Sequence, residues 1–108
     1  MNDRLATITN LFEEKEIRSI WNSEKGDYYF SVVDVIAALS NANIPKRYWT
    51  DLKRKLINEG SEVYERIVRL KLKASDGKMR KTDTLDTEGI FRLIESIPSP
   101  KAEPLKLW

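Results

Sequence analysis

The chain has 108 residues, of which 41% are hydrophobic and 33% charged, a composition that suits one folded domain with one core rather than a disordered chain. It contains no cysteine and no histidine, which excludes disulfides, thiol nucleophiles, imidazole bases and zinc sites built from those ligands. The net charge of +2 conceals a basic middle, because residues 46–81 hold 12 Lys and Arg against 5 Asp and Glu, whereas the rest of the chain holds 7 against 12.

The N-terminal third predicts a group of antiparallel strands. Residues 8–12 and 16–22 mix apolar and polar side chains, and Asp27–Ser31 follows a turn-forming Ser-Glu-Lys-Gly segment. Large aromatic side chains in this region suit a half-buried sheet face: Trp21, Tyr28 and Phe30.

A first helix is expected to begin after Ser31 and to end near Ser40. Ser31 can cap this helix, and Asp34 follows it at the capping-box position. The apolar residues share one helical face and are expected in the core: Val32, Val35, Ile36 and Leu39.

A second helix is expected from Pro45 to about Asn58, because proline suits the first turn of a helix and Gly60 lies just beyond the end. At 100° per residue, one arc of this helix is apolar and is expected in the core: Tyr48, Trp49, Leu52 and Leu56. The opposite arc is cationic or polar: Lys46, Arg47, Thr50, Lys53 and Arg54. The helix therefore has one face for the core and one for an anionic partner, although a solvated charged face is the ordinary alternative.

Residues 63–74 alternate imperfectly between apolar and polar side chains and predict a strand. The pair Asp76-Gly77 favours a two-residue hairpin turn, so residues 79–84 should form the returning strand. That register sets Lys73 opposite Arg80 and would bring Lys71, Lys73 and Arg80 onto one face, with Lys78 beside the turn. Such crowding of like charges indicates an anionic partner, although lysines also protect an edge strand from aggregation.

Asp86 is expected to cap a last helix that ends near Ser96, before Pro98. Its apolar stripe is Ile90, Leu93, Ile94 and Ile97. The elements together predict an α+β domain, in which small antiparallel strands and hairpins pack with three to four helices and two of the helices form a helix-turn-helix-like pair.

Several segments in order resemble the N-terminal domain of the Bro family, known from prophage antirepressor-like proteins. The aromatic strand that leads into the first helix resembles its signature, and the second helix, the hairpin, the last helix and the closing stretch each resemble a further motif. These segments are residues 28–35 (YYFSVVDV), 46–49 (KRYW) with 52–53, 76–80 (DGKMR) with 82–83, 86–94 (DTEGIFRLI) and 97–108.

The resemblance implies an α+β DNA-binding domain found in phage and prophage proteins and in large DNA viruses, often fused to a variable C-terminal domain. Residues 1–108 are accordingly expected to form a single such domain at the N-terminal end of a longer protein. Lys15 departs from the family pattern, in which a turn glycine is common at this point.

The expected function is that of a DNA-binding, antirepressor-like transcriptional regulator, with duplex DNA as the expected partner. The second helix of the helix-turn-helix-like pair would lie in a major groove. Lys46 and Lys53 would contact phosphates, while Arg47, Thr50 and Arg54 would approach base edges. The hairpin offers a second contact surface: Lys71, Lys73, Lys78 and Arg80.

Two other classes of function were compared with DNA binding. A protein-interaction or dimerisation module could bind a phage repressor, or a second copy of the chain, through the apolar tail at residues 105–108. An enzyme would need carboxylates such as Asp34, Asp83, Asp86 or Glu88 to act in catalysis, but helix capping accounts for Asp34 and Asp86.

We therefore expect no catalytic residue, metal or cofactor, and a cytoplasmic location without a membrane span. Stacking of Trp21, Tyr48 and Trp49 on unpaired bases is the alternative to their packing in the core, and core packing is favoured.

Overall fold

The strands form one antiparallel sheet in the order β1-β2-β4-β3. The computed structural model describes residues 17–40 and 42–97. The strands are β1 (Ser19–Asn22), β2 (Asp27–Ser31), β3 (Val68–Lys73) and β4 (Met79–Asp86). The sheet curls, which brings its edge strands β1 and β3 close together. Nη1 of Arg18, just before β1, donates to the carbonyl of Lys73 at the end of β3, at 3.0 Å.

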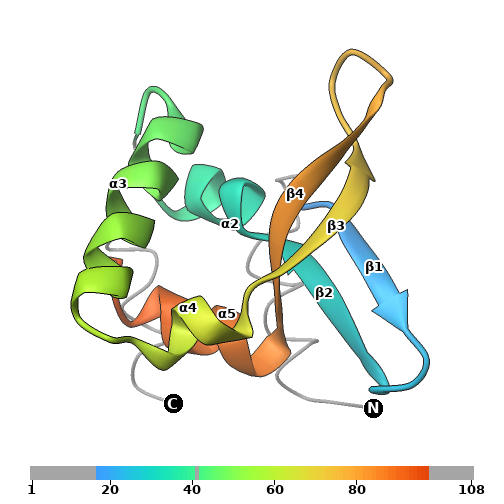
Figure 1. Ribbon diagram of the computed structural model, residues 1–108. Helices are drawn as coiled ribbons and strands as arrows, with labels where there is room; N and C mark the ends of the chain where they lie inside the picture. Colours follow the sequence, from blue (N-terminus) through green and yellow to red (C-terminus); the bar gives the residue numbers. More distant parts are fainter. Residues whose placement is uncertain (1–16, 41, 98–108) are drawn as a thin grey trace.

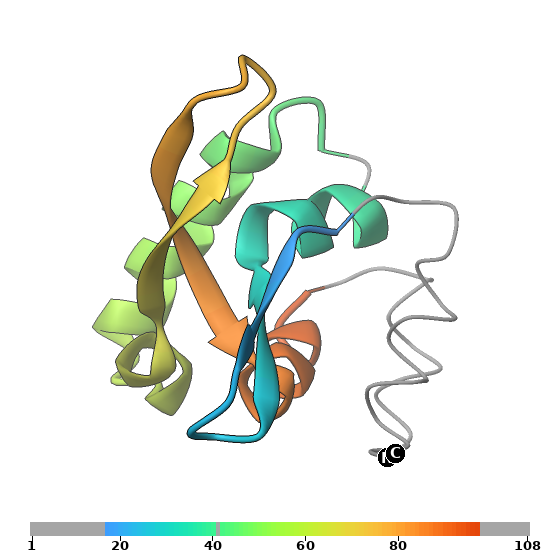
Figure 2. The same cartoon turned by 90° about the vertical axis from the view of Figure 1, so that its right-hand side faces the viewer.

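The described helices gather on one side of this sheet, as Figures 1 and 2 show. They are α2 (Val32–Leu39), α3 (Pro45–Asn58), α4 (Glu62–Arg66) and α5 (Thr87–Ile94). Strands and helices therefore form an α+β fold, as the sequence predicts. None of the described helices has the length and apolarity required to cross a bilayer.

The helix boundaries follow local signals in the sequence. The Ser31 hydroxyl accepts a hydrogen bond from the Asp34 amide, and the Asp86 carboxylate accepts one from the Gly89 amide at 2.8 Å. Both predicted caps are confirmed. α3 begins at Pro45 as predicted, and Gly60, with φ +67°, adopts the left-handed conformation just beyond its end.

A single apolar core lies between the sheet and the helices. The apolar stripes predicted for α2 and α5 are buried there, and Leu85 of β4 and Phe30 of β2 complete it from the sheet. Trp49 is 4% exposed and belongs to this core as predicted, whereas Trp21 is 53% exposed and the core packing predicted for it is wrong. Trp21 instead packs edge-on against Tyr28, its neighbour across the β1–β2 pair.

The strand predicted for residues 63–74 is wrong in its first part, where α4 forms instead. The Ser61 hydroxyl accepts a hydrogen bond from the Val63 amide and caps this short helix. Val63 is buried in the core and Ile67 packs against it, a four-residue spacing that suits a helix. The N-terminal strand is also shorter than predicted, since β1 begins at Ser19. The strand expected at residues 8–12 and the tail at residues 101–108 lie outside the described residues.

The hairpin between β3 and β4 differs from the prediction in its register. The loop spans residues 74–78, because the Ala74 amide donates to the Lys78 carbonyl and the Asp76 carboxylate accepts from the Lys78 amide. Leu72 consequently pairs with Arg80, and Lys71 with Lys81. Since directly opposite residues share a face, the predicted grouping of Arg80 with Lys71 and Lys73 is wrong.

Gly89 provides a stability test of the cap on α5. A Cβ at this position would lie 3.0 Å from Asp86 Oδ1 and 3.0 Å from Leu85 Cδ2, and Leu85 is fully buried. Crowding in a packed core costs about 1–3 kcal/mol, which exceeds the gain of roughly 1 kcal/mol in helix propensity. We predict that Gly89→Ala lowers the free energy of unfolding by about 1 kcal/mol in urea titrations. The control is the reverse change, Ala37→Gly, at an exposed position of α2, and it should also lower the free energy of unfolding. Alanine is then preferred at position 37 and glycine at position 89. A stabilised Gly89→Ala protein would contradict this account.

Candidate nucleic-acid interface

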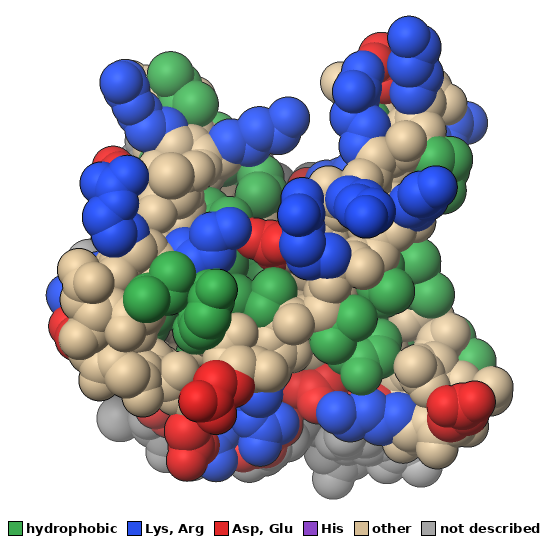
Figure 3. Space-filling view, viewed as in Figure 1, with side chains coloured by type: hydrophobic (Ala, Val, Ile, Leu, Met, Phe, Trp, Pro, Cys, Tyr) green, Lys and Arg blue, Asp and Glu red, His purple; other side chains and the backbone are tan. Residues whose placement is uncertain are grey.

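A cleft of about 300 Å³ separates α3 from the ribbon, by which we mean β3, β4 and the loop that joins them. Figure 3 shows this hollow with Lys and Arg side chains along both of its rims. The residues that line it come from both walls, from the first turn of α2 and from the position just before β1: Arg18, Val33, Lys46, Trp49, Thr50, Arg69, Ala74, Arg80, Lys81, Thr82 and Asp83. Segments about 30 residues apart in the sequence therefore contribute cations to one hollow.

Helical periodicity determines which residues of α3 face the ribbon. Lys46, Thr50 and Lys53 recur at intervals of four and three residues and form one stripe along the helix. Arg47 and Arg54 lie about 80–100° around the helix from that stripe, at 100° per residue. Both arginines are exposed but do not line the cleft. The five predicted contact residues of α3 thus divide into a stripe toward the ribbon and a flank toward solvent.

Asp83 of β4 joins the two walls at the floor of the cleft. Its carboxylate accepts hydrogen bonds from Trp49 Nε1 at 2.8 Å and from Lys53 Nζ at 2.8 Å. Arg69 Nε lies 3.4 Å from the same carboxylate, whose side chain is only 10% exposed. Burial opposes ionisation of Asp83, but the hydrogen bonds from Lys53 and Trp49 and the charges of Lys53 and Arg69 outweigh it and hold the pKa below its ordinary value.

Other cations of the cleft differ in how far carboxylates neutralise them. Arg80 pairs with Asp76 of the hairpin loop, and this hydrogen bond is the main cause that lowers the pKa of Asp76. Lys81, by contrast, forms no ion pair within the described part of the chain, and its direct cross-strand partner is Lys71. Like charges opposite each other destabilise a sheet, so an anion bound beside Lys71 and Lys81 would relieve their repulsion.

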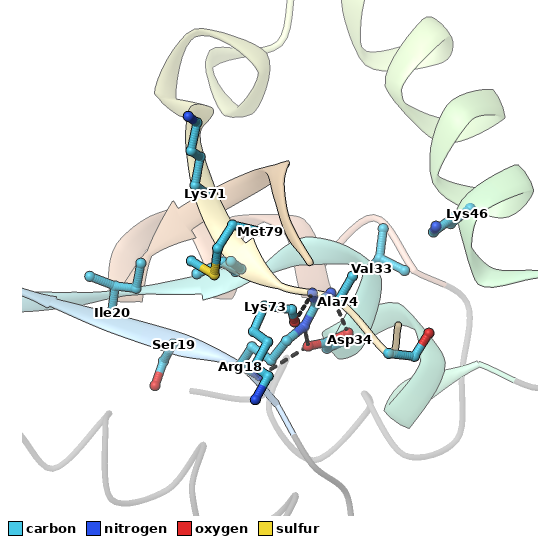
Figure 4. A pocket seen from close by; sticks show the side chains of 12 residues that line it. Arg18, Ser19, Ile20, Val33, Asp34, Lys46, Lys71, Lys73, Ala74 and Met79 are labelled. Carbon is cyan, nitrogen blue, oxygen red and sulfur yellow. Dashed lines mark hydrogen bonds and ion pairs between the residues drawn. The ribbon is translucent and has the colours of Figure 1, made fainter. Parts of the chain in front are cut away.

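A second hollow, of about 830 Å³, adjoins the cleft and lies between β3 and β1. Figure 4 shows the Arg18–Asp34 pair at its centre, with Lys71 and Lys73 extending from β3 and Lys46 reaching in from α3. Arg18 Nε lies 2.7 Å from Asp34 Oδ2, so the charge of Asp34 is compensated.

The nine residues predicted to contact DNA are distributed as follows. The cleft is lined by Lys46, Thr50 and Arg80, and the second hollow by Lys46, Lys71 and Lys73. Lys53 is held by Asp83 at the floor. The remaining three are exposed and line neither hollow: Arg47, Arg54 and Lys78.

Sequence reasoning missed Arg18, Arg69 and Lys81 as lining residues, and Asp83 as the residue that joins the walls. The correct hairpin register would have revealed the Arg69–Asp83 pair and the position of Lys81. The bonds from α3 to Asp83 had no local signal, because Trp49 and Asp83 are 34 residues apart.

The carboxylates considered for catalysis each have structural partners. Asp86 caps α5 and also pairs with Lys25 and Arg66. Burial opposes ionisation of Asp86 too, but Lys25, the Gly89 amide and Arg66 together lower its pKa. Glu88 pairs with Arg92. Within residues 17–40 and 42–97, no three His, Cys, Asp or Glu side chains lie together as metal ligands would.

Comparison with known proteins gives one family. The sequence model described as the N-terminal domain of the BRO family matches residues 16–108. No curated protein and no solved structure matches the chain significantly.

The ion pairs at the floor of the cleft predict a pH-dependent stability. Because the pKa of Asp83 is lower in the folded protein than the unfolded value of about 3.9, its contribution is present above that value and is lost as the pH falls through the folded pKa. We predict that Asp83→Asn costs about 1–3 kcal/mol of unfolding free energy at pH 7, as expected for hydrogen bonds to a charged group. The cost should shrink below about pH 4, where the wild-type carboxyl also becomes protonated.

Denaturant unfolding at several pH values measures this effect. The control Asp51→Asn removes an exposed carboxylate from α3 and should change stability by less than about 0.5 kcal/mol. An Asp83→Asn cost that stays constant from pH 7 to pH 3 would show that the carboxylate charge is not what joins the walls.

Proposed function

Because the chain belongs to the BRO N-terminal domain family, we propose that it is the DNA-binding domain of a prophage antirepressor-like transcriptional regulator. Domains of this family generally bind DNA. The observation that supports the proposal most is that cations of α3 and of the ribbon face one another across one hollow. Converging cations provide the sequence-independent attraction to phosphates on which DNA affinity depends.

Duplex DNA fits the lining of the two hollows better than single-stranded nucleic acid. Proteins that bind single strands generally stack bases on exposed aromatic rings. Trp49 is the one aromatic residue among those that line either hollow in the described part of the chain, and it is 4% exposed. This surface therefore suits phosphate contacts rather than base stacking.

The proposal assigns different roles to the two sides of α3. Lys46 and Lys53 contact phosphates, and on the ribbon the phosphate contacts come from Lys71, Lys73, Lys78, Arg80 and Lys81. On the outer flank of α3, Arg47 and Arg54 approach base edges, because arginine pairs bidentately with guanine. Thr50, predicted to approach base edges too, belongs to the stripe that lines the cleft. Lys53 must share its ammonium group with Asp83, so its contribution should be smaller than that of Lys46.

A module that binds a repressor or a second copy of the chain is the alternative function. The apolar tail at residues 105–108 suggested it, and this tail lies outside the described residues. The charge of the cleft favours a polyanion, so DNA remains the partner proposed here.

Fluorescence anisotropy with a random duplex at several salt concentrations tests the phosphate contacts. Lys46→Ala and Lys81→Ala should each weaken binding on the order of tenfold at low salt and flatten the log–log salt dependence by about 0.9. Both changes should be the same for every duplex sequence.

The matched control is Lys55→Ala. Lys55 lies nine residues from Lys46, on the opposite side of α3, where it is exposed and 4.0 Å from Glu59. This variant loses the same charge but should bind nearly as the wild type does. Equal effects of all three substitutions would mean that net charge, rather than the cleft, determines affinity.

Selection of bound duplexes from a random pool tests the sequence preference of the domain. Arg47→Ala and Arg54→Ala should each reduce discrimination at one base pair by about 1–3 kcal/mol, because each removes a bidentate contact to a base. The salt dependence should change little. An unchanged selected sequence in both variants would remove the outer flank of α3 from base recognition.

A further inference from the structure

The cleft is too narrow for a whole duplex. α3 and the ribbon are in direct contact at its floor, where Trp49 and Lys53 both donate to Asp83 at 2.8 Å. Its volume of about 300 Å³ is that of a small ligand site. Whatever anion enters it must therefore be thin, such as one strand of a nucleic acid.

The two hollows adjoin and form one channel along the inner side of the ribbon. Four residues line both of them: Arg18, Val33, Lys46 and Ala74. The channel runs from α3, across the first turn of α2, to the edge strand β1. Both carboxylates within it are compensated, Asp34 by Arg18 and Asp83 by Lys53 and Arg69. Cations line the channel along its length. The cleft contributes Arg69, Arg80 and Lys81, the second hollow contributes Lys71 and Lys73, and Lys46 lines both.

A row of cations in a narrow channel without an exposed aromatic ring matches a sugar–phosphate backbone rather than bases. We propose, on the basis of the proposed DNA-binding function, that one backbone of a DNA duplex lies in this channel. The ribbon then stands on one side of that backbone and α3 on the other.

The shape of the ribbon agrees with this placement. Its loop projects beyond α2 and away from the sheet in Figures 1 and 2. A two-stranded ribbon fits the major groove of DNA, which is about 12 Å wide. With one backbone held in the channel, the projecting loop enters the groove next to that backbone, and Lys78 is the basic residue of that loop.

Filling the cleft without changing its charge tests the proposal. Thr50 is exposed and lines the cleft, and its hydroxyl donates only within α3, to the Lys46 carbonyl. Thr50→Phe should weaken duplex binding at least tenfold in anisotropy titrations, because the ring occupies the space of the backbone. The control Ser23→Phe adds the same ring to an exposed position in the turn between β1 and β2, outside both hollows, and should bind within twofold of the wild type.

A second measurement uses the unaltered protein, so its result does not depend on whether Thr50→Phe folds. Duplexes that carry one neutral methylphosphonate at successive positions should lose affinity over a short continuous run of phosphates on one strand. Affinity losses spread equally over both strands would overturn the channel proposal, and so would a folded Thr50→Phe protein that binds as Ser23→Phe does. Failure of the wild type to bind any duplex would instead overturn the proposed function itself.

Discussion

The contact between α3 and β4 at Asp83 is the interaction on which the candidate interface depends. Without a carboxylate at this point, Lys53 and Arg69 would repel each other at the floor of the cleft, and Trp49 would lose the acceptor for its indole N–H. With the carboxylate ionised, Lys53 and the buried Trp49 connect α3 to a ribbon residue 30 positions after Lys53, and Arg69 adds a pair across the ribbon. The fold thus uses part of its basic charge to set the geometry of the cleft. Lys46 and Lys81, at the rims, form no ion pair with any residue in 17–40 or 42–97.

Structural and binding roles are therefore divided among similar side chains. Arg18, Lys53 and Arg69 each serve a carboxylate within the fold, so substitution at these positions would affect stability as well as any bound anion. Lys71 and Lys81, opposite each other across the ribbon, pair with no carboxylate in the part of the chain that the structure describes, and their mutual repulsion opposes folding. This contrast, more than the net charge of +2, distinguishes the candidate interface from an ordinary solvated surface.

The sequence predicted those parts of the fold that local signals determine. Pro45 and Gly60 bounded α3 correctly, and Ser31 and Asp86 identified two helix starts through their capping side chains.

The register predicted for the hairpin was wrong, because an Asp-Gly pair does not distinguish a two-residue loop from the five-residue loop that the Asp76 side chain stabilises. That difference moved Arg80 to the other face and concealed Lys81. α4 was missed because a five-residue helix shows too little periodicity to outweigh the alternating pattern that follows it. The bonds to Asp83 are tertiary, and no spacing in the sequence reports them.

The most direct test of the account is to map where duplex DNA contacts the domain in solution. In heteronuclear NMR spectra of the isotope-labelled protein, we expect a duplex to shift the amide signals of Lys46, Thr50 and Lys81 together, with a dependence on salt. The signals around Lys55 on the opposite side of α3 should stay in place. Shifts confined to a different face, or a cleft whose signals do not respond to DNA, would contradict the claim that α3 and the ribbon jointly form the binding surface.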